Sequence, residues 1–399
     1  MAYHVPFPIG TITMNPALFN KPRLMTPGPT DVPPAVLLEM AQPIIHHRTK
    51  EFQAIFAELS ELLRRLFRTA GPVLTIAGSG TTAFEAAQTS LIEPGAKALT
   101  IAGGKFGERW QDIYDAHDVG QHRINAEWGN ATNPEQVKQL LDDHPDISVV
   151  TIVHSETSTA TASDIQAIAA IVRQTDALLI VDGITAVGAL PLDMDDWGID
   201  VLVTGSQKAL MLPPGLGFVG LGERAVARLE SVEPAHVYNL DLRRWLKSHK
   251  DDDVPFTPPV NLIRGQLVAL RMIEDQGLDM IWDRTAALAK AGRAAFEAMG
   301  LKLISTSPSD SVTGAFYPDG IDDKTFRGDL RDDFGIHVAG GQAGRGADWK
   351  GRIFRISHMG HVDVGDPLAT LAAIEAALIQ QDVKIKPGTA LDAATAALQ

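Results

Sequence analysis

The chain has 399 residues, of which 45% are hydrophobic and 21% charged, the balance of a soluble globular protein with about two domains. The formal charge of −14 argues against a nucleic-acid surface and against adhesion to anionic membranes, so we expect small-molecule ligands. The absence of cysteine excludes disulfides, thiolate metal sites and thiol nucleophiles. No apolar run approaches the ~20 residues of a membrane span. The N-terminus lacks the pattern of a signal peptide, so we expect a cytoplasmic protein.

The first part of the chain changes from an irregular to a helical pattern. Residues 1–23 are rich in proline and show no period, which predicts an N-terminal arm. From residue 33 to residue 67 apolar side chains recur at steps of three and four, which predicts helix.

Short apolar runs then alternate with helical stretches. The runs at 73–77, 98–102, 148–153, 178–182 and 200–204 predict strands, and 81–92, 107–117, 133–144 and 163–174 predict helices between them. Strands that are apolar throughout and separated by helices indicate a mostly parallel sheet covered on both faces. The fold class is therefore α/β.

The pattern loosens after about residue 235. Residues 251–259 predict an exposed loop, and a long helix is expected at about 261–298. Residues 301–380 mix short strands, glycine-rich loops and a helix at 366–381, which predicts a smaller α+β domain. We expect an arm at 1–23, a large domain at 24–275, a small domain at 276–385 and a fraying alanine-rich tail at 386–399.

An aspartate and a lysine each follow an apolar run. Asp182 ends the strand at 178–182, and ligands of open parallel sheets collect at the carboxyl ends of strands. Lys208 follows the strand at 200–204 among small residues. The pKa of a lysine falls when the amine is buried, and the neutral amine can attack an aldehyde. The local pattern also fits an ordinary surface lysine in a loop.

Two other segments carry possible binding groups. Ser79, Gly80 and Thr81 lie between a strand and a helix, where free backbone N–H groups can bind phosphate, although the same residues serve as ordinary helix caps. Arg355 lies within an apolar strand and therefore needs a carboxylate partner, either from the fold or from a substrate.

The run from 200 to 219 resembles the lysine signature of class V aminotransferases, which depend on pyridoxal 5'-phosphate (PLP). The features in common are the apolar strand, two small residues, Gln207-Lys208, and then Gly215 and Gly217. Lys208 also follows Asp182 at the family's spacing. The resemblance spans about residues 22–380 and is closest to the alanine–glyoxylate and serine–glyoxylate group. It implies a fold type I PLP-dependent transferase, with a large domain and a smaller C-terminal α+β domain.

The resemblance also implies a role for individual residues. Lys208 would hold PLP as a Schiff base and move the substrate proton, and Asp182 would pair with the pyridine nitrogen. The other cofactor contacts would be Ser79, Gly80, Thr81 and Gln207 at the phosphate, Phe106 stacked on the ring, and Thr157 near the ring hydroxyl. Gly28 and Arg355 would bind the substrate. Thr257 would reach the cofactor phosphate of a partner subunit, which predicts a homodimer.

Some positions depart from the family pattern or stay open. Phe106 stands where many relatives have tryptophan, and Val254 stands where the alanine–glyoxylate enzymes have tyrosine. His154 fits a structural role as well as a functional one. His46 and His47 are adjacent, but no other residue has ligand spacing, so we expect no metal and a structural or substrate-mouth role for this pair.

The implied activity is ping-pong transamination from a small amino acid, such as alanine or serine, to a 2-oxo acid such as glyoxylate or pyruvate. A pyridoxamine–pyruvate aminotransferase and a PLP-dependent lyase of the same fold are alternatives, and a non-catalytic subunit is a remote one. The intact phosphate loop with Gln207 and Thr257 weighs against the first. The absence of cysteine excludes the cysteine desulfurases of this class.

Overall fold

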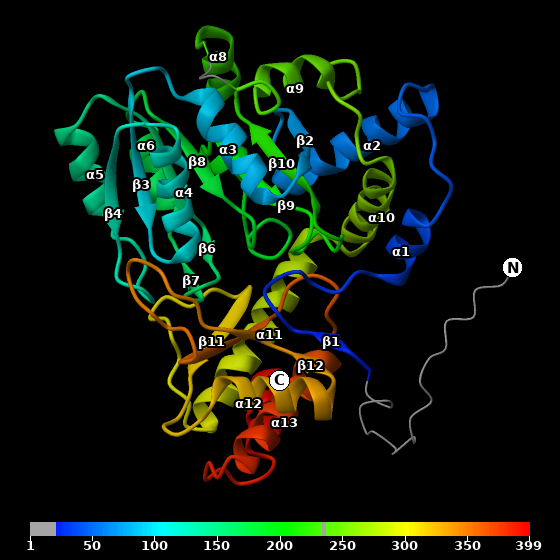
Figure 1. Ribbon diagram of the computed structural model, residues 1–399, viewed down its shortest axis with the longest axis vertical. Coiled ribbons are helices and arrows are strands. Elements are labelled where there is room, and N and C mark those ends of the chain that lie inside the picture. Colours follow the sequence, from blue (N-terminus) through cyan, green and yellow to red (C-terminus); the bar gives the residue numbers. More distant parts are fainter. Residues whose placement is uncertain (1–20, 234–236) are drawn as a thin grey trace, which may run out of the picture.

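The computed structural model describes residues 21–233 and 237–399, so the predicted arm at 1–23 lies outside the described residues except for its last three. The centre is a seven-stranded sheet in the order β2-β10-β9-β8-β5-β3-β4 (Figure 1). Its strands are β2 (Val73–Gly78), β3 (Lys97–Ala102), β4 (Gln121–Asn125), β5 (Ile147–Val153), β8 (Leu178–Asp182), β9 (Val201–Gly205) and β10 (Gly215–Leu221). All neighbours pair in parallel except β10, which is antiparallel to both β2 and β9.

Helices flank this sheet on both faces. Every residue of β8 and of β9 is buried, and successive side chains of a strand point to opposite faces. The helices of this part are α1 (Pro34–Met40), α2 (Lys50–Phe67), α3 (Gly80–Leu91), α4 (Lys105–Ala116), α5 (Pro134–Asp143), α6 (Ile165–Val172), α7 (Met194–Trp197), α8 (Glu223–Ser231), α9 (Leu242–His249) and α10 (Val260–Gln276). The short pair β6 (Ser155–Glu156) and β7 (Thr161–Ala162) follows β5.

A second hydrophobic core lies below the sheet in the view of Figure 1. It is built from α11 (Leu278–Ala298), β11 (Val312–Phe316), α12 (Asp323–Phe334), β12 (Ile336–His337), β13 (Ala339–Gly340), β14 (Ile353–Ser357), α13 (Gly365–Gln380) and α14 (Thr389–Ala397). The N-terminal strand β1 (Arg23–Leu24) pairs with β12, and the buried Met25 belongs to this core. The described part of the chain therefore passes through the second core before it enters the large sheet.

The five predicted strands and the four predicted helices between them are confirmed to within one or two residues at most ends. The prediction of one long helix at 261–298 is wrong. Helix α10 ends at Gln276, Gly277 takes a φ of 80° outside the helical region, and α11 begins at Leu278. The helical pattern of 33–67 is likewise two helices, and the side chain of Thr49 caps the second. Strands β4 and β10 were not predicted.

The C-terminal residues differ from the fraying tail that the composition predicts. Helix α14 packs into the second core through Ala390 and Ala394, which are fully buried. The carboxylate of Glu375 on α13 accepts hydrogen bonds from the N–H groups of Gly388 and Ala390, both at 2.6 Å. A buried acid thus satisfies the free donors at the start of α14 and anchors this helix.

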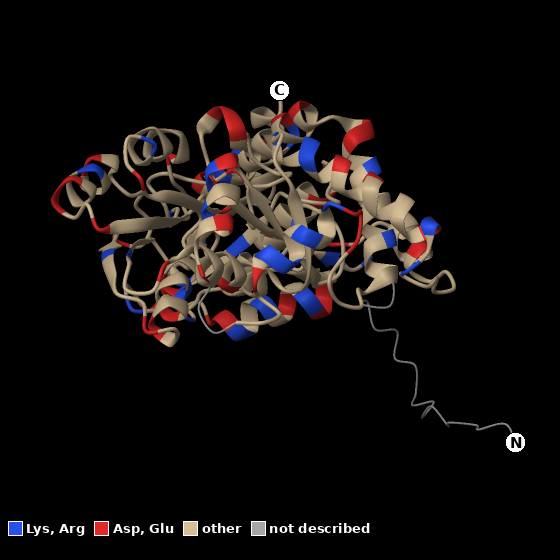
Figure 2. Cartoon of the chain, turned by 90° about the horizontal axis from the view of Figure 1, so that it is seen from above, with Lys and Arg blue, Asp and Glu red and all other residues tan. Residues whose placement is uncertain are grey.

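Acidic and basic residues are interspersed over the helices in the view of Figure 2. Among the described residues, no helix combines the length and the apolar character that crossing a bilayer requires.

We expect Glu375→Ala to lower the free energy of unfolding by about 1–3 kcal/mol, because two buried N–H groups lose their acceptor. Urea denaturation measures the loss, and limited proteolysis should cut first near residues 386–399. Glu297→Ala, an exposed acid on α11, is the matched control. Equal stability of the two variants would contradict the anchoring role of Glu375.

Candidate active site

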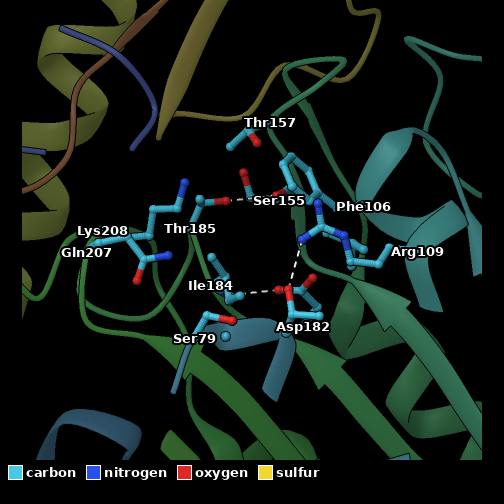
Figure 3. A pocket seen from close by; sticks show the side chains of 13 residues that line it. Ser79, Phe106, Arg109, Ser155, Thr157, Asp182, Ile184, Thr185, Gln207 and Lys208 are labelled. Atoms are coloured by element: carbon cyan, nitrogen blue, oxygen red, sulfur yellow. Dashed lines mark hydrogen bonds between the residues drawn. The ribbon is translucent and has the colours of Figure 1, made fainter. Parts of the chain in front are cut away.

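A cavity of about 200 Å³ lies where the carboxyl ends of β5, β8 and β9 meet the amino end of α3. This is the edge at which open parallel sheets bind their ligands. Its walls combine a lysine, an aspartate and an arginine with hydroxyls and an aromatic ring (Figure 3). The lining residues are Ser79, Gly80, Thr81, Phe106, Arg109, Val153, Ser155, Thr157, Asp182, Ile184, Thr185, Gln207 and Lys208. Eight of the predicted cofactor residues therefore surround one cavity.

Asp182 forms one wall as a buried carboxylate. Its Oδ1 accepts the N–H of Ile184 at 2.9 Å, and its Oδ2 accepts the indole N–H of Trp110 at 3.3 Å. Burial raises the pKa of Asp182 to about 7, and no ion pair among the described residues includes it. A cationic N–H group in the cavity would restore the charged form of this carboxylate.

Lys208 enters the cavity from the loop after β9. Its Nζ donates a hydrogen bond of 2.6 Å to the carbonyl of Pro27. Burial, and next the charge of Arg355, lower the pKa of Lys208 to about 8. A substantial fraction of this amine is therefore neutral, and nucleophilic, near physiological pH.

Ser79 is the N-cap of α3, and Gly80 and Thr81 form its first turn. The N–H groups of a first turn have no acceptor within their own helix and face the positive end of the helix dipole. Thr82 already caps this end, because its Oγ1 accepts the N–H of Ser79 at 3.2 Å. The Gln207 carboxamide lines the cavity as well, and its Nε2 is a donor that can bind an anion. The arrangement suits an anion.

Phe106 and Arg109 lie on the first turns of α4. The Arg109 guanidinium lies 5.0 Å from the centre of the Phe106 ring and donates to Thr81 Oγ1 at 3.0 Å. The buried carboxylate of Glu156 accepts the N–H groups of Phe106 and Gly107 at 3.0 and 2.9 Å. A buried acid therefore holds the start of α4 and, with it, the aromatic wall.

Arg355 projects from β14 of the second core and is buried. Its guanidinium donates to the carbonyls of Thr157 and Gly340, at 2.5 and 2.6 Å. Its Nε has no partner, and no carboxylate of the described residues lies within ion-pair distance. Burial lowers the pKa of Arg355 to about 10, so the side chain stays cationic at neutral pH. The fold thus supplies no ion-pair partner for this arginine, which remains available to a ligand.

Other candidate residues lie elsewhere. Gly28 contacts Lys208 rather than lining the cavity wall, and Thr257 lines a separate hollow with Trp245 and Phe256. His154 is fully buried against Trp197, and burial lowers its pKa to about 4, which favours the structural role. The rings of His46 and His47 stack on each other at 4.8 Å and do not line the cavity.

Sequence reasoning did not assign Arg109, Ser155, Ile184 or Thr185 to the cavity. Arg109 had a signal: it follows Phe106 by three positions on a helix, and residues three apart share one face. No sequence pattern could have identified Thr185, because its hydrogen bond to the carbonyl of Ser155 joins residues that are 30 positions apart.

Two other features lie away from this edge of the sheet, and neither contains a residue that the sequence analysis proposed for the active site. A larger hollow of about 600 Å³ lies near the opposite ends of β2 and β9. The ligand atoms of His122, His144 and Asp146 lie within 4.8 Å of one another. However, the two rings stack at 3.9 Å and Lys97 pairs with Asp146 at 2.9 Å, so the group does not point at a common cation.

Comparison with known proteins decides the family. The family model "Aminotransferase class-V" matches residues 24–353. This chain is a class V aminotransferase. An uncharacterized aminotransferase of Methanocaldococcus jannaschii is 41% identical, over 92% of this chain and 95% of that protein. The serine–glyoxylate aminotransferase of Methylorubrum extorquens is 32% identical over 94% and 96%. The crystal structure of pyridoxamine–pyruvate aminotransferase from Mesorhizobium loti has a TM-score of 0.88, with 30% identity over 95% and 97%.

The cofactor of this aminotransferase is pyridoxal 5'-phosphate, and the fold is type I. The cavity fits the cofactor at three points. Asp182 is a buried carboxylate with no ion-pair partner among the described residues, the amine of Lys208 lines the same cavity, and the first turn of α3 offers free N–H groups to a phosphate. The family resemblance read from the sequence is therefore confirmed, as are the fold class, the enzyme class and the cofactor.

We expect Lys208 of the cofactor-free enzyme to react with an acylating reagent with a midpoint near pH 8, since only the neutral amine reacts. Below this pH the ammonium form dominates and labelling stops; above it labelling reaches a plateau. Peptide mass spectrometry measures the modified fraction of Lys208, and Lys208→Ala is the control that lacks the labelled peptide. A midpoint for Lys208 near the pKa of about 10.4 that lysine has in short peptides would contradict the burial of the amine.

Proposed function

We propose that this enzyme transfers the amino group of a small amino acid, such as alanine or serine, to a 2-oxo acid such as glyoxylate or pyruvate. The observation that carries the proposal is the convergence of Lys208, Asp182 and the phosphate-binding turn on one cavity, with Arg355 contacting its rim at Thr157. The likeness to the serine–glyoxylate enzyme supports the choice of substrates.

The positions of the cavity residues support a set of cofactor-binding roles. Asp182 pairs with the ring nitrogen, because it is the buried carboxylate at the base of the cavity. Ser79, Gly80, Thr81 and Gln207 hold the phosphate, and Phe106 packs against the ring. Thr157 offers its hydroxyl to the ring substituent next to the aldehyde. Bound PLP supplies an electron-withdrawing ring that stabilises negative charge at the substrate α-carbon.

The substrate-binding roles involve the second core. Arg355 binds the α-carboxylate through its planar guanidinium, since the fold supplies no carboxylate for it. Lys208 acts as the general base that removes the α-proton and returns it, and its lowered pKa suits proton transfer near neutral pH. Lys208 can act in this way only when its amine is not covalently bound.

Adding alanine or serine to the purified PLP-loaded enzyme should convert the yellow aldehyde form of the cofactor to the colourless amine form, and glyoxylate or pyruvate should reverse the change. Lys208→Ala should abolish both conversions and the borohydride-trappable protein adduct, while Lys384→Ala should behave like the wild type. Absorbance spectra and steady-state rates across donors and acceptors measure the outcome. No conversion with any amino acid would overturn the proposal.

The structural likeness to pyridoxamine–pyruvate aminotransferase provides the second candidate. This second function requires that the enzyme, when it carries no PLP, converts free pyridoxamine and pyruvate. The first turn of α3 and Gln207 favour a bound phosphate and therefore the first candidate. The same assay, run without PLP, separates the two.

We also propose a cytoplasmic homodimer in which Thr257 reaches the partner's cofactor phosphate. Thr257 is exposed on the loop before α10 and does not line its own cavity. Helix α1 packs on α10. The side chains of Leu37 and Leu38 on α1 are 50% and 67% exposed, and that of Ile44, which follows α1, is 73% exposed. Such apolar surface beside the Thr257 loop is typical of an interface.

Mixed subunits test this arrangement. Thr257→Glu should inactivate a homodimer, because the added carboxylate repels the phosphate. Mixing it with inactive Lys208→Ala should restore activity, because each mixed dimer then holds one site with an intact lysine and an intact threonine. Sedimentation gives the oligomeric state. Full activity of a monomer, or no recovery on mixing under conditions where subunits exchange, would contradict the shared site.

A further inference from the structure

The segment from Met25 to Thr30 connects the lysine to the strand that carries Arg355. Thr30 Oγ1 donates to the carbonyl of Lys208 at 2.7 Å, and the N–H of Thr30 donates to the carbonyl of Gln207 at 3.1 Å. At the other end, the N–H of Ser357 donates to the carbonyl of Met25 at 2.8 Å. One short segment, hydrogen-bonded at both ends, thus spans the lysine loop and β14.

The middle of this segment holds the lysine side chain. The carbonyl of Pro27 accepts the Nζ hydrogen bond at 2.6 Å. A methyl group on the next residue, Gly28, would lie 2.2 Å from Nζ, 2.5 Å from Cδ and 2.6 Å from Cε of Lys208. The φ of Gly28 is +133°, which side chains rarely adopt. Only glycine leaves the space that the amine occupies.

We propose that the Pro27 carbonyl and the open space at Gly28 form a resting position for the amine of Lys208 whenever this amine carries no covalent partner. The proposal rests on the proposed function, in which the free amine moves a proton and must then wait beside the reacting carbon. The carbonyl stabilises the free amine, most strongly as an ammonium ion.

The resting position also links the lysine to the substrate arginine. Because the segment is bonded to both the Lys208 loop and β14, the amine is held in a fixed relation to Arg355. Pro27 and Gly28 are therefore positioning residues, which act through Lys208. The family resemblance instead places Gly28 beside the substrate, and the two roles predict different kinetics.

Gly28→Ala tests the resting position directly. The methyl group displaces the free amine and leaves the cofactor pocket intact, so PLP affinity should not fall, and it should rise because the free amine that competes with the covalent bond loses its hydrogen bond. The rate at saturating amino donor should fall at least about tenfold, the effect of losing one hydrogen bond to a charged group. At saturating donor, the fraction of Lys208 that borohydride traps on the cofactor should rise. Peptide mass spectrometry measures that fraction.

Hydroxylamine gives a readout that needs no amino donor, since it displaces lysine from an aldehyde. Release of PLP from Lys208 by hydroxylamine should slow in Gly28→Ala. The matched control is Gly320→Ala: Gly320 also has a positive φ, of +88°, but an added methyl group there meets no atom within 4 Å. This control should match the wild type in every assay.

A separate pair of variants covers the case in which Gly28→Ala does not fold. Thr30→Val removes the hydroxyl that holds the Lys208 backbone, and Thr30→Ser retains it. We expect Thr30→Val to raise the trapped fraction and slow hydroxylamine release, and Thr30→Ser to restore both.

Three outcomes are decisive. A raised KM with unchanged kcat, trapped fraction and hydroxylamine rate would assign Gly28 to the substrate and overturn the resting position. If Thr30→Val and the wild type show the same trapped fraction of Lys208 and the same rate of PLP release, the resting position is overturned as well. If the wild-type protein reacts with hydroxylamine but does not react with any amino donor, the proposed function is refuted. The comparison of variants would still test the resting position.

Discussion

The structure depends on three buried ionisable side chains, Asp182 and Lys208 in the cavity wall and Arg355 at its rim, that form no ion pairs with one another. Enclosing a charge is costly unless other groups satisfy it. Here neutral groups do so: Asp182 accepts two N–H groups, and Arg355 and Lys208 donate to carbonyls. Each side chain is satisfied in part and still offers charge or a free atom to a ligand. A bound cofactor and the carboxylate of a substrate can supply the remaining interactions.

The sheet positions these groups through the ends of its strands. β8 ends at Asp182 and β9 leads to Lys208, and parallel pairing brings both ends to one edge. The antiparallel β10 then returns between β9 and β2, beside the phosphate-binding turn of α3. Gly215 and Gly217, the two glycines that follow the lysine in the signature, thus belong to a strand that packs under this turn: a methyl group on Gly217 would lie 2.9 Å from the carbonyl of Ser79.

Several hydrogen bonds join the two cores close to the cavity. Arg355 of the second core donates to Thr157 of the first, and the buried hydroxyls of Ser155 and Ser309 bond at 2.7 Å. The segment at 25–30 adds a further connection, contributed by residues that precede the whole large sheet. The substrate arginine is therefore held by contacts to the same loops that line the cofactor cavity, so displacement of one core would alter both sites.

The sequence alone determined the α/β class, the order of the central strands β2, β3, β5, β8 and β9 with the helices between them, and the residues that follow each strand. These are local properties: an apolar run of five residues predicts a strand, and the residue after it must lie at the sheet edge. Lys208, Asp182 and the Ser79 turn could be found in this way, and the family resemblance added their roles. Only the tertiary structure decided which distant groups touch. The contacts of Lys208 with Pro27 and of Arg109 with Thr81, and the packing of α14 against Glu375, join residues that are not neighbours in sequence, and the break at Gly277 depends on one backbone angle. No local pattern encodes such contacts, because their energy comes from packing that forms only when the chain closes on itself.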